Sequence, residues 1–328
     1  MLTVNVRPPL ASHARLSGRP LRFYTQATDP ATGYGRLAEA CMQSLNMVHV
    51  SPLDYPDFIL SDPMNAAVSP IRFTMWEPTQ LPPSAIGFMS ARALIVPCKM
   101  NVRVFRSSGY RGFIHNVPLW GEAGWSPMPS DDVFKFICIG RDNSVRSRKG
   151  VDELIEWFGL AFPTEKDVRL TIKSSPHCPR RDPSDKRVTV IREDFPRQKY
   201  EEMLAAHHCG VFLSGLEGWN FPACELMAAG RPSIIVPWGG PADFTTPETS
   251  WHLPYTMVQA PSGIPYLGVG QGAKPTKDGV IWALRDAYRN RDLVRDKAVR
   301  SYEMSIKFTK DKFMERLRVV ALDILSSV

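Results

Sequence analysis

Residues 211–232 read VFLSGLEGWNFPACELMAAGRP, and this stretch decides the fold that the sequence predicts. It begins with the apolar run Val211–Leu213, which is typical of a strand buried on both faces of a sheet. A loop with two glycines follows. A short helix is then expected over Pro222–Ala229, with proline at its start and Gly230 at its stop. A strand that leads through a loop into a helix is the unit from which parallel α/β sheets are built.

The same alternation of apolar runs and helical patterns extends on both sides of this stretch. In the second half, strands are expected at Phe134–Ile139, Val168–Ile172, Val188–Ile191 and Ser233–Val236, and helices at Val151–Phe162 and Gln198–His208. In the first half, a helix is expected at Arg36–Leu45, and strands at Leu21–Tyr24, Met47–Val50, Phe58–Leu60, Ile71–Met75, Ala93–Val96 and Phe113–Val117.

Two such blocks predict an α/β protein with two doubly wound, Rossmann-like domains that face a cleft. The segment Trp120–Pro129 is interrupted by glycine and proline and is the predicted interdomain linker. We place the domains at residues 1–122 and 123–300. Residues 301–328 form a C-terminal helix, and the helical pattern over Arg291–Leu325 is broken near Lys307–Thr309.

Composition excludes several classes of protein. The chain has 328 residues, of which 44% are hydrophobic and 22% charged, as in ordinary globular proteins. No apolar run is long enough to span a membrane, and the N-terminal residues lack the apolar core of a signal peptide. We therefore expect a cytoplasmic protein without a transmembrane segment. The net charge of +7 favours anionic ligands, which include nucleotides, acidic lipid headgroups and nucleic acid.

The six cysteines indicate neither a disulfide framework nor a metal site. They are scattered and form no C-x-x-C pair, so we expect reduced, mostly buried thiols. The run His207-His208-Cys209 lies between a predicted helix and a predicted strand, where adjacent side chains point in different directions. Packing is therefore favoured over metal binding for this run, and no metal site is expected.

Two carboxylates lie on either side of the loop at residues 218–221. Glu217 follows the buried strand, and Glu225 is in the first turn of the helix, so both are expected to project into the crevice at the strand ends. The backbone N–H groups of Gly218 to Phe221 precede the helix and could bind an anion. Carboxylates beside them would suit sugar or ribose hydroxyls. The alternatives are a favourable helix-start charge for Glu225 and a solvated loop position for Glu217.

Basic residues follow the strand Phe134–Ile139. Arg141 leaves its carboxyl end, and Arg148 and Lys149 precede the next helix. A guanidinium and an ammonium group can neutralise a diphosphate without a metal. The chain has no D-x-D motif, which a divalent-metal phosphate site could have used. The alternative is a solvated basic loop.

Taken together, these motifs resemble those of the GT-B glycosyltransferases, specifically the family 4 type. The resemblance extends from about residue 21 to the C-terminus. In the second half it rests on Gly140-Arg141, Arg148-Lys149-Gly150-Val151, the E-x7-E pair Glu217 and Glu225, Met227–Pro232 and Gly239-Gly240. In the first half it rests on Gly33-Tyr34-Gly35, Phe73–Glu77, Leu81-Pro82, Ile95–Pro97, Phe105, Gly109 and Val117-Pro118.

The resemblance implies a metal-independent transferase of the hexosyl or pentosyl type. It would move a sugar, with retention, from a nucleotide-diphosphate sugar to an acceptor hydroxyl; a UDP-sugar is the expected donor, and no other cofactor is expected. Residues 1–122 would form the acceptor-side domain and residues 123–300 the donor domain. The C-terminal helix would cross back onto the first domain.

The resemblance also implies roles for individual residues. Arg141 and Lys149, with Arg148 able to share the role of the lysine, would hold the diphosphate. Glu217 would contact the donor sugar, and Glu225 the ribose. The segment Gly218, Trp219, Asn220 and Phe221 would touch the sugar or the phosphates. The family often has glycine where this chain has Asn220, and asparagine tolerates the positive φ that such a turn needs.

Weaker candidates lie in the first domain. Gly33 and Gly35 would let the backbone approach a substrate, or they form an ordinary turn between a strand and a helix. Trp76 and Glu77 end a predicted strand at the cleft and are candidates for contacts with the acceptor; a capping aromatic ring and a solvated acid are the alternative.

The acceptor is left open by the sequence. A glycan or polysaccharide is slightly favoured. A hydroxylated base in DNA, as in phage-type enzymes, would suit the basic charge. Contact with a membrane surface, for lipid-linked glycans, is a further alternative. A catalytically inactive nucleotide-sugar-binding module is the rival from another class, although the motif residues Arg141 and Glu225 are present. The oligomeric state is not indicated.

Overall fold

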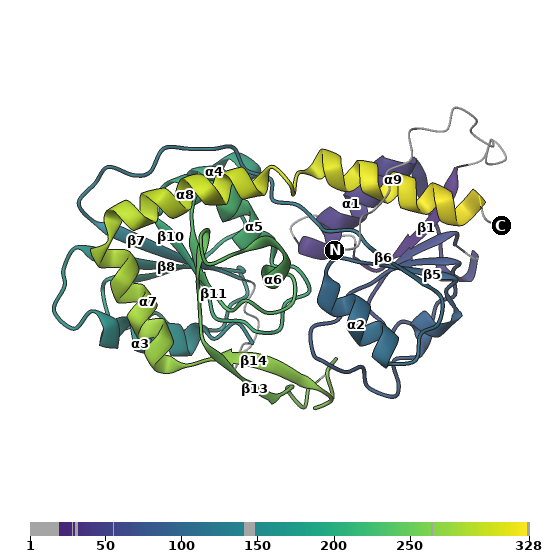
Figure 1. The fold of residues 1–328 in the computed structure, drawn as a ribbon, viewed down its shortest axis with the longest axis horizontal. Coiled ribbons are helices and arrows are strands. Elements are labelled where there is room, and N and C mark those ends of the chain that lie inside the picture. The colour runs from purple at the N-terminus through teal and green to yellow at the C-terminus, as the bar shows by residue number, and fades with distance from the viewer. Residues whose placement is uncertain are drawn as a thin grey trace.

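Two six-stranded parallel sheets form the framework of the computed structural model, which describes residues 20–27, 29, 32–54, 56–140, 148–263 and 265–326 (Figure 1). The first sheet has the order β2-β1-β3-β4-β5-β6. Its strands are β1 (Leu21–Thr25), β2 (Met47–His49), β3 (Phe58–Leu60), β4 (Ile71–Phe73), β5 (Ala93–Val96) and β6 (Phe113–Asn116). We call this sheet, with its helices, the N-terminal lobe.

The second sheet has the order β12-β11-β10-β7-β8-β9 and forms the C-terminal lobe. Its strands are β7 (Phe134–Ile139), β8 (Val168–Ser174), β9 (Val188–Arg192), β10 (Cys209–Phe212), β11 (Ser233–Ile235) and β12 (Ser250–His252). An antiparallel hairpin, β13 (Tyr255–Gln259) and β14 (Gln271–Pro275), extends from this lobe. The central strands β7 and β10 are neighbours, so the loops that follow them meet at one edge of the sheet.

Helices connect the parallel strands, as right-handed crossovers in such sheets require. They are α1 (Gly33–Leu45), α2 (Lys99–Ser107), α3 (Val151–Ala161), α4 (Arg197–Ala205), α5 (Phe221–Ala228), α6 (Pro241–Phe244), α7 (Lys277–Arg289), α8 (Arg291–Ser305) and α9 (Lys310–Ser326). Short 3-10 turns lie at Pro52–Asp54 and Gly87–Ser90. Helix α1 begins where the Thr32 side chain caps the Gly35 N–H at 2.9 Å, and it ends at Asn46 in the left-handed region.

The helix predicted over Gln198–His208 is too long. It ends at Ala205, because the two histidines that follow are held by other contacts. The ring of His207 hydrogen-bonds to the Met203 carbonyl and the Thr171 hydroxyl. The ring of His208 accepts from the Lys135 N–H, and β10 begins at the next residue, Cys209. These contacts agree with packing rather than metal binding. All six cysteines are buried and free, as predicted.

The C-terminal helix crosses back onto the N-terminal lobe, as predicted (Figure 1). Helix α9 packs on α1, where the Ser44 hydroxyl donates to the Met314 carbonyl at 2.8 Å and Arg318 donates to the Ser44 carbonyl at 3.1 Å. Its Phe313 ring lies 4.7 Å from Trp120, which in turn lies 5.2 Å from Phe221 of α5. One apolar core therefore runs through both lobes.

The predicted domain boundary at residue 122 falls between the two sheets, since β6 ends at Asn116 and β7 begins at Phe134. The division into three units stays a prediction. Within the described ranges, no helix combines the length and the apolar character that a membrane span needs.

Candidate functional site

An ion-paired cluster lies at the carboxyl ends of β7 and β10. Lys149, just before α3, places its ammonium nitrogen 2.5 Å from an Oε1 oxygen of Glu217, which lies on the loop after β10. The Arg148 guanidinium is 3.4 Å from the same oxygen and also donates to the Leu216 carbonyl. The structure thus brings together three of the predicted site residues, from two loops that the strand order makes adjacent.

Burial and ion pairing oppose each other in this cluster. Glu217 is only 4% exposed, and burial alone would raise the pKa of its carboxyl group. Lys149 and Arg148 outweigh this effect, so the pKa of Glu217 lies below its ordinary value. Burial lowers the pKa of Lys149, although Glu217 opposes the shift. Glu217 is therefore a carboxylate that can accept hydrogen bonds beside two cationic donors.

Glu77 of the N-terminal lobe faces this cluster across the interface between the lobes. Burial raises the pKa of Glu77, and the nearby charge of Glu217 adds to the shift, whereas Arg148 and Lys149 oppose it. Burial also raises the pKa of the Tyr266 hydroxyl, in the segment between β13 and β14, and the nearby charge of Glu77 adds to this shift. We call Glu77, Arg148, Lys149, Glu217 and Tyr266 the cleft cluster.

Trp76, the other predicted acceptor-side residue, is buried. Its side chain is 1% exposed, its indole N–H donates to the Gln80 carbonyl at 2.7 Å, and its ring packs edge-on against Tyr266. This placement matches the alternative of a capping aromatic ring for Trp76.

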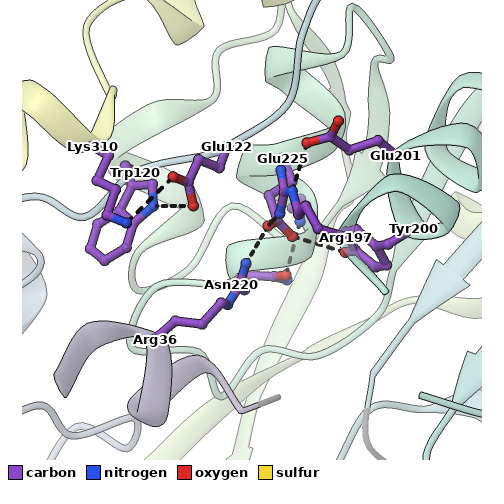
Figure 2. Close-up of polar contacts among 10 residues, drawn as sticks. Arg36, Trp120, Glu122, Arg197, Tyr200, Glu201, Asn220, Glu225 and Lys310 are labelled. Carbon is purple, nitrogen blue, oxygen red and sulfur yellow. Dashed lines mark hydrogen bonds and ion pairs between the residues drawn. The ribbon is translucent and has the colours of Figure 1, made fainter. Parts of the chain in front are cut away.

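Glu225 belongs to a second set of contacts, shown in Figure 2. Its side chain is fully buried, and its Oε1 oxygen pairs with Arg36 of α1 and, at 2.9 Å, with Arg197 of α4. Its Oε2 oxygen accepts from the Tyr200 hydroxyl at 2.8 Å. The two glutamates of the E-x7-E pair therefore have different partners, and the expected common exposure of both to one crevice is not seen for Glu225.

The loop between the two glutamates adopts the predicted turn. Asn220 has φ 78° and caps α5, because its side-chain oxygen accepts from the Ala223 N–H at 3.2 Å. Gly218 packs so closely on Met75 of the other lobe that an added Cβ would lie 2.6 Å from the sulfur. Trp219 is 2% exposed and packs on Phe244, so its side chain is structural.

The Phe221 ring is also largely buried, under the Arg36 guanidinium at 4.7 Å from the ring centre. The start of helix α5 offers fewer free backbone N–H donors for an anion than expected. Pro222 has no N–H, and the N–H of Ala223 already donates to the Asn220 side chain.

The remaining predicted residues divide into two groups. Arg141 lies outside the described residues. Gly33 is the first residue of α1, and the Gly35 N–H donates to the Thr32 cap, which matches the ordinary-turn alternative for this loop.

A cavity of about 180 Å³ adjoins the cleft cluster beside Arg148. It lies between the start of α3 and the β13–β14 hairpin, and its lining includes Glu153, Trp157, Leu216 and Val258. Throughout the ranges that the structure describes, no three His, Cys, Asp or Glu side chains gather as metal ligands.

Sequence reasoning missed four residues of the two sets. Arg36 directly follows the glycine loop Gly33-Tyr34-Gly35, and this position could have marked it as a candidate site residue. Arg197 and Tyr200 lie on the first turns of a helix whose ends were misplaced. Tyr266 lies in a segment without periodicity, and no pattern marked it.

Comparisons with known proteins bear on the fold. No protein-family model and no curated protein matches the sequence. Among solved structures, S. aureus TarM, in complex with fondaparinux, alpha-GlcNAc-glycerol and UDP, gives a TM-score of 0.60 at 12% identity over 81% of this chain and 55% of its own. The pneumococcal O-GlcNAc transferase GtfA, in complex with UDP and GlcNAc, gives a TM-score of 0.59 at 12% identity. The match covers 89% of this chain and 60% of GtfA.

A third match is sucrose-phosphate synthase from Thermosynechococcus elongatus, with a TM-score of 0.64 at 13% identity over 88% of this chain and 77% of its own. The chain thus spans little more than half the length of the first two matches. At these identities the likeness shows the fold, so the chain has the GT-B architecture of two Rossmann-like lobes.

Proposed function

We propose that the protein transfers a sugar from a nucleoside diphosphate sugar to an acceptor hydroxyl, as a GT-B glycosyltransferase of the family 4 type. The observation that carries this proposal is the Lys149–Glu217 ion pair, with Arg148 beside it, at the ends of adjacent strands opposite Glu77. Ligands of doubly wound sheets bind at such strand ends. Glycosyltransferases with the same fold support the proposal, and two of their complexes contain UDP.

In the proposed site, Lys149 and Arg148 bind the diphosphate of the donor. Positive charge placed where the leaving phosphate develops its own charge stabilises the transition state. Arg141 extends this set, by the resemblance described above. Glu217, held as a carboxylate by the two cations, accepts hydrogen bonds from hydroxyls of the donor sugar.

The proposed reaction retains the configuration of the anomeric carbon and needs no metal. The acceptor oxygen bonds to the anomeric carbon on the face from which the diphosphate departs, and the leaving phosphate oxygen takes the acceptor proton. Glu217 is then a positioning carboxylate and not a covalent nucleophile. The ribose contact expected of Glu225 is left out of the proposal, because that side chain is fully buried among Arg36, Arg197 and Tyr200.

The acceptor in this proposal is a neutral glycan. Glu77 lies on the N-terminal lobe, across from the group of Arg148, Lys149 and Glu217, and its carboxylate suits hydroxyl donors better than the phosphates of DNA.

The test is a screen of UDP-, GDP- and ADP-sugars for donor hydrolysis and transfer, made with wild type, Lys149→Met and the surface control Lys166→Met. With the preferred donor, Lys149→Met should lower kcat/KM by about 10²–10³-fold and weaken nucleotide diphosphate binding, whereas the control should match wild type. Wild-type turnover by Lys149→Met would refute the site. Nucleotide binding by wild type without turnover of any donor would favour the inactive binding module.

A further inference from the structure

The β13–β14 hairpin belongs to neither of the six-stranded sheets, and it extends from the C-terminal lobe toward the N-terminal lobe (Figure 1). It is fixed to the loop after β10, where the Ala273 N–H donates to the Gly215 carbonyl at 3.1 Å. A Cβ added to Gly215 would collide with the Ala273 carbonyl, so the two backbones approach each other closely. The hairpin is therefore anchored in the lobe from which it comes.

The far end of the hairpin is bonded to the N-terminal lobe. The Thr79 N–H donates to the Gln271 carbonyl at 2.9 Å, and the Gln271 N–H donates to the Thr79 hydroxyl at 2.9 Å. Gly270 brings the chains closer still, since its φ is 78° and an added Cβ would lie 2.7 Å from the backbone nitrogen of Gln80. Glycine adopts this conformation without strain and leaves room for the neighbouring chain.

The segment that joins the two strands of the hairpin adds an apolar anchor. Tyr266 is 7% exposed, and its ring packs edge-on against Trp76 of the N-terminal lobe, with ring centres 5.5 Å apart. Ala260 is buried in the same apolar cluster, which also contains Phe88 and Phe105. A segment that begins and ends in the C-terminal lobe thus places two side chains in the core of the other lobe.

The backbone beside this anchor is held in an unfavourable conformation. Leu267 has φ 54°, in the left-handed region, and its side chain is 45% exposed. This region is unfavourable for a leucine, so the packing of Tyr266 beside it has to offset the cost. The docked hairpin therefore holds strain that release of Tyr266 from Trp76 would relieve.

The cleft cluster is nearly closed in this arrangement. Glu217 is 4% exposed, and the Lys149 side chain is 18% exposed. The adjoining cavity of about 180 Å³ has Gln259 and Pro261 of the hairpin in its wall. Sites for small organic ligands usually measure about 300–1,000 Å³, so a nucleoside diphosphate sugar does not fit beside the cluster until this wall moves.

We infer that the β13–β14 hairpin is a strap between the lobes, which detaches from Trp76, Thr79 and Gln80 to admit the donor and docks again to close the site. The inference rests on the proposed function and adds to it the step by which the donor enters. Two hydrogen bonds and a buried ring hold the strap to the N-terminal lobe, whereas the antiparallel ladder joins β13 to β14 over their whole length. The contact with the N-terminal lobe is therefore the one that breaks, while the hairpin stays folded.

A disulfide lock tests the strap. In Thr79→Cys/Gln271→Cys, cysteines replace two residues whose backbones are hydrogen-bonded, a separation that suits a disulfide. We expect oxidation to slow the association of UDP, GDP or ADP, whichever binds the wild type, by at least about tenfold in stopped-flow fluorescence, and reduction to restore it. The matched control is Gln259→Cys/Gln271→Cys, in which the disulfide joins register partners within the hairpin and leaves the strap free to move. Association at the wild-type rate in the oxidised first variant would overturn the inference.

Hydrogen exchange of the unliganded protein gives a readout that needs neither donor nor turnover. The amides of Thr79 and Gln271 bond to each other's residue, so a strap that detaches as one unit should expose both with the same opening free energy. Tyr266→Ala removes the buried ring and should speed up both exchanges by about tenfold or more, while the ladder between β13 and β14 keeps its protection. Tyr255→Ala is the control, since this tyrosine lies on the same hairpin with its side chain 38% exposed. Unchanged exchange at Thr79 and Gln271 in Tyr266→Ala would contradict the inference.

Gly270→Ala provides the same readout if Tyr266→Ala does not fold. A Cβ at this position would push against Gln80 and should likewise speed up exchange at Thr79 and Gln271, whereas at Gly263 an added Cβ meets nothing within 4 Å and should leave it unchanged. The two proposals can fail separately. A wild-type protein that binds none of the three nucleoside diphosphates and turns over no donor would refute the proposed function, and hydrogen exchange would still decide whether the hairpin detaches.

Discussion

Arg36 on α1 and Glu225 on α5 form an ion pair between the lobes in which the carboxylate is fully buried and the guanidinium is 24% exposed (Figure 2). The partners are therefore unequal. If the cations are removed, a buried charge is left without compensation, whereas removal of the carboxylate leaves two guanidinium groups that water can reach.

This asymmetry predicts the order of stability among variants. The double variant Arg36→Ala/Arg197→Ala should lose about 3–5 kcal/mol of unfolding free energy, because Glu225 remains buried and, among the described residues, keeps Tyr200 as its one side-chain partner. Glu225→Gln keeps the shape and should lose about 1–3 kcal/mol. Glu201→Ala, which removes only a surface partner of Arg197, should lose less than about 1 kcal/mol. Urea denaturation measures all three, and equal losses would contradict the asymmetry.

Asn220 combines a left-handed backbone with a helix cap. Asn220→Ala should cost about 2 kcal/mol, because alanine is strained at φ 78° and cannot accept from the Ala223 N–H. Asn220→Gly loses the cap but not the backbone freedom, so it should cost only a few tenths of a kcal/mol. Thermal unfolding of the two variants checks this, and a glycine variant as unstable as the alanine variant would disprove the backbone argument.

The buried position of His208 predicts that the folded protein loses stability in acid. Burial, helped by the charge of Arg291, lowers its pKa to about 4. The unfolded chain, with an ordinary histidine pKa of about 6.5, then binds more protons than the folded protein between pH 6.5 and 4. Stability should therefore fall as the pH drops through this window, by up to about 3 kcal/mol from this residue alone.

The structural reason is that the Nδ1 atom of His208 accepts from the Lys135 N–H at 3.1 Å, and protonation would convert this acceptor into a donor. The variant His208→Asn keeps an acceptor near that position but does not titrate. Its unfolding free energy should show a shallower dependence on pH between 6.5 and 4, measured by urea titration. The same slope as wild type would exclude His208 as a source of the effect.

Removal of divalent metal ions by a chelator tests whether the proposed sugar transfer needs a metal. If Lys149 and Arg148 supply the positive charge at the donor phosphates, turnover should persist at near its full rate after dialysis against EDTA. Recovery of a lost activity by Mg²⁺ or Mn²⁺ would contradict the proposal. Lys149→Met in the same assay shows how much of the rate depends on the ammonium group.

The parallel strands were predictable from the sequence where their side chains are buried on both faces of the sheet. Runs such as Ala93–Val96, which is apolar throughout, and Phe134–Ile139, which is apolar except for Lys135, are expected of parallel strands covered on both faces, and their bounds match β5 and β7. Helix α2 and the β13–β14 hairpin were missed. The hairpin strand β13 is mostly exposed, so it carries no alternating apolar pattern that a sequence can reveal.

The cleft cluster was predictable only in part. Lys149 and Glu217 were found because each follows a buried strand, and the chemistry of their loops is local. The partners of Glu225 were not found, since Arg36 lies 189 residues away in sequence and no local pattern links the two. Tyr266 reaches Trp76 through the folding of a whole hairpin, which periodicity does not encode.

The chain crosses between the lobes twice, near residues 121–122 and near residues 308–310, and these two segments contact each other. The Gly121 N–H donates to the Phe308 carbonyl at 3.1 Å, and Lys310 lies 3.6 Å from Glu122 (Figure 2). The two crossings are therefore one joint rather than two independent linkers. A movement that parts residues 121–122 from residues 308–310 has to break this hydrogen bond and this ion pair together.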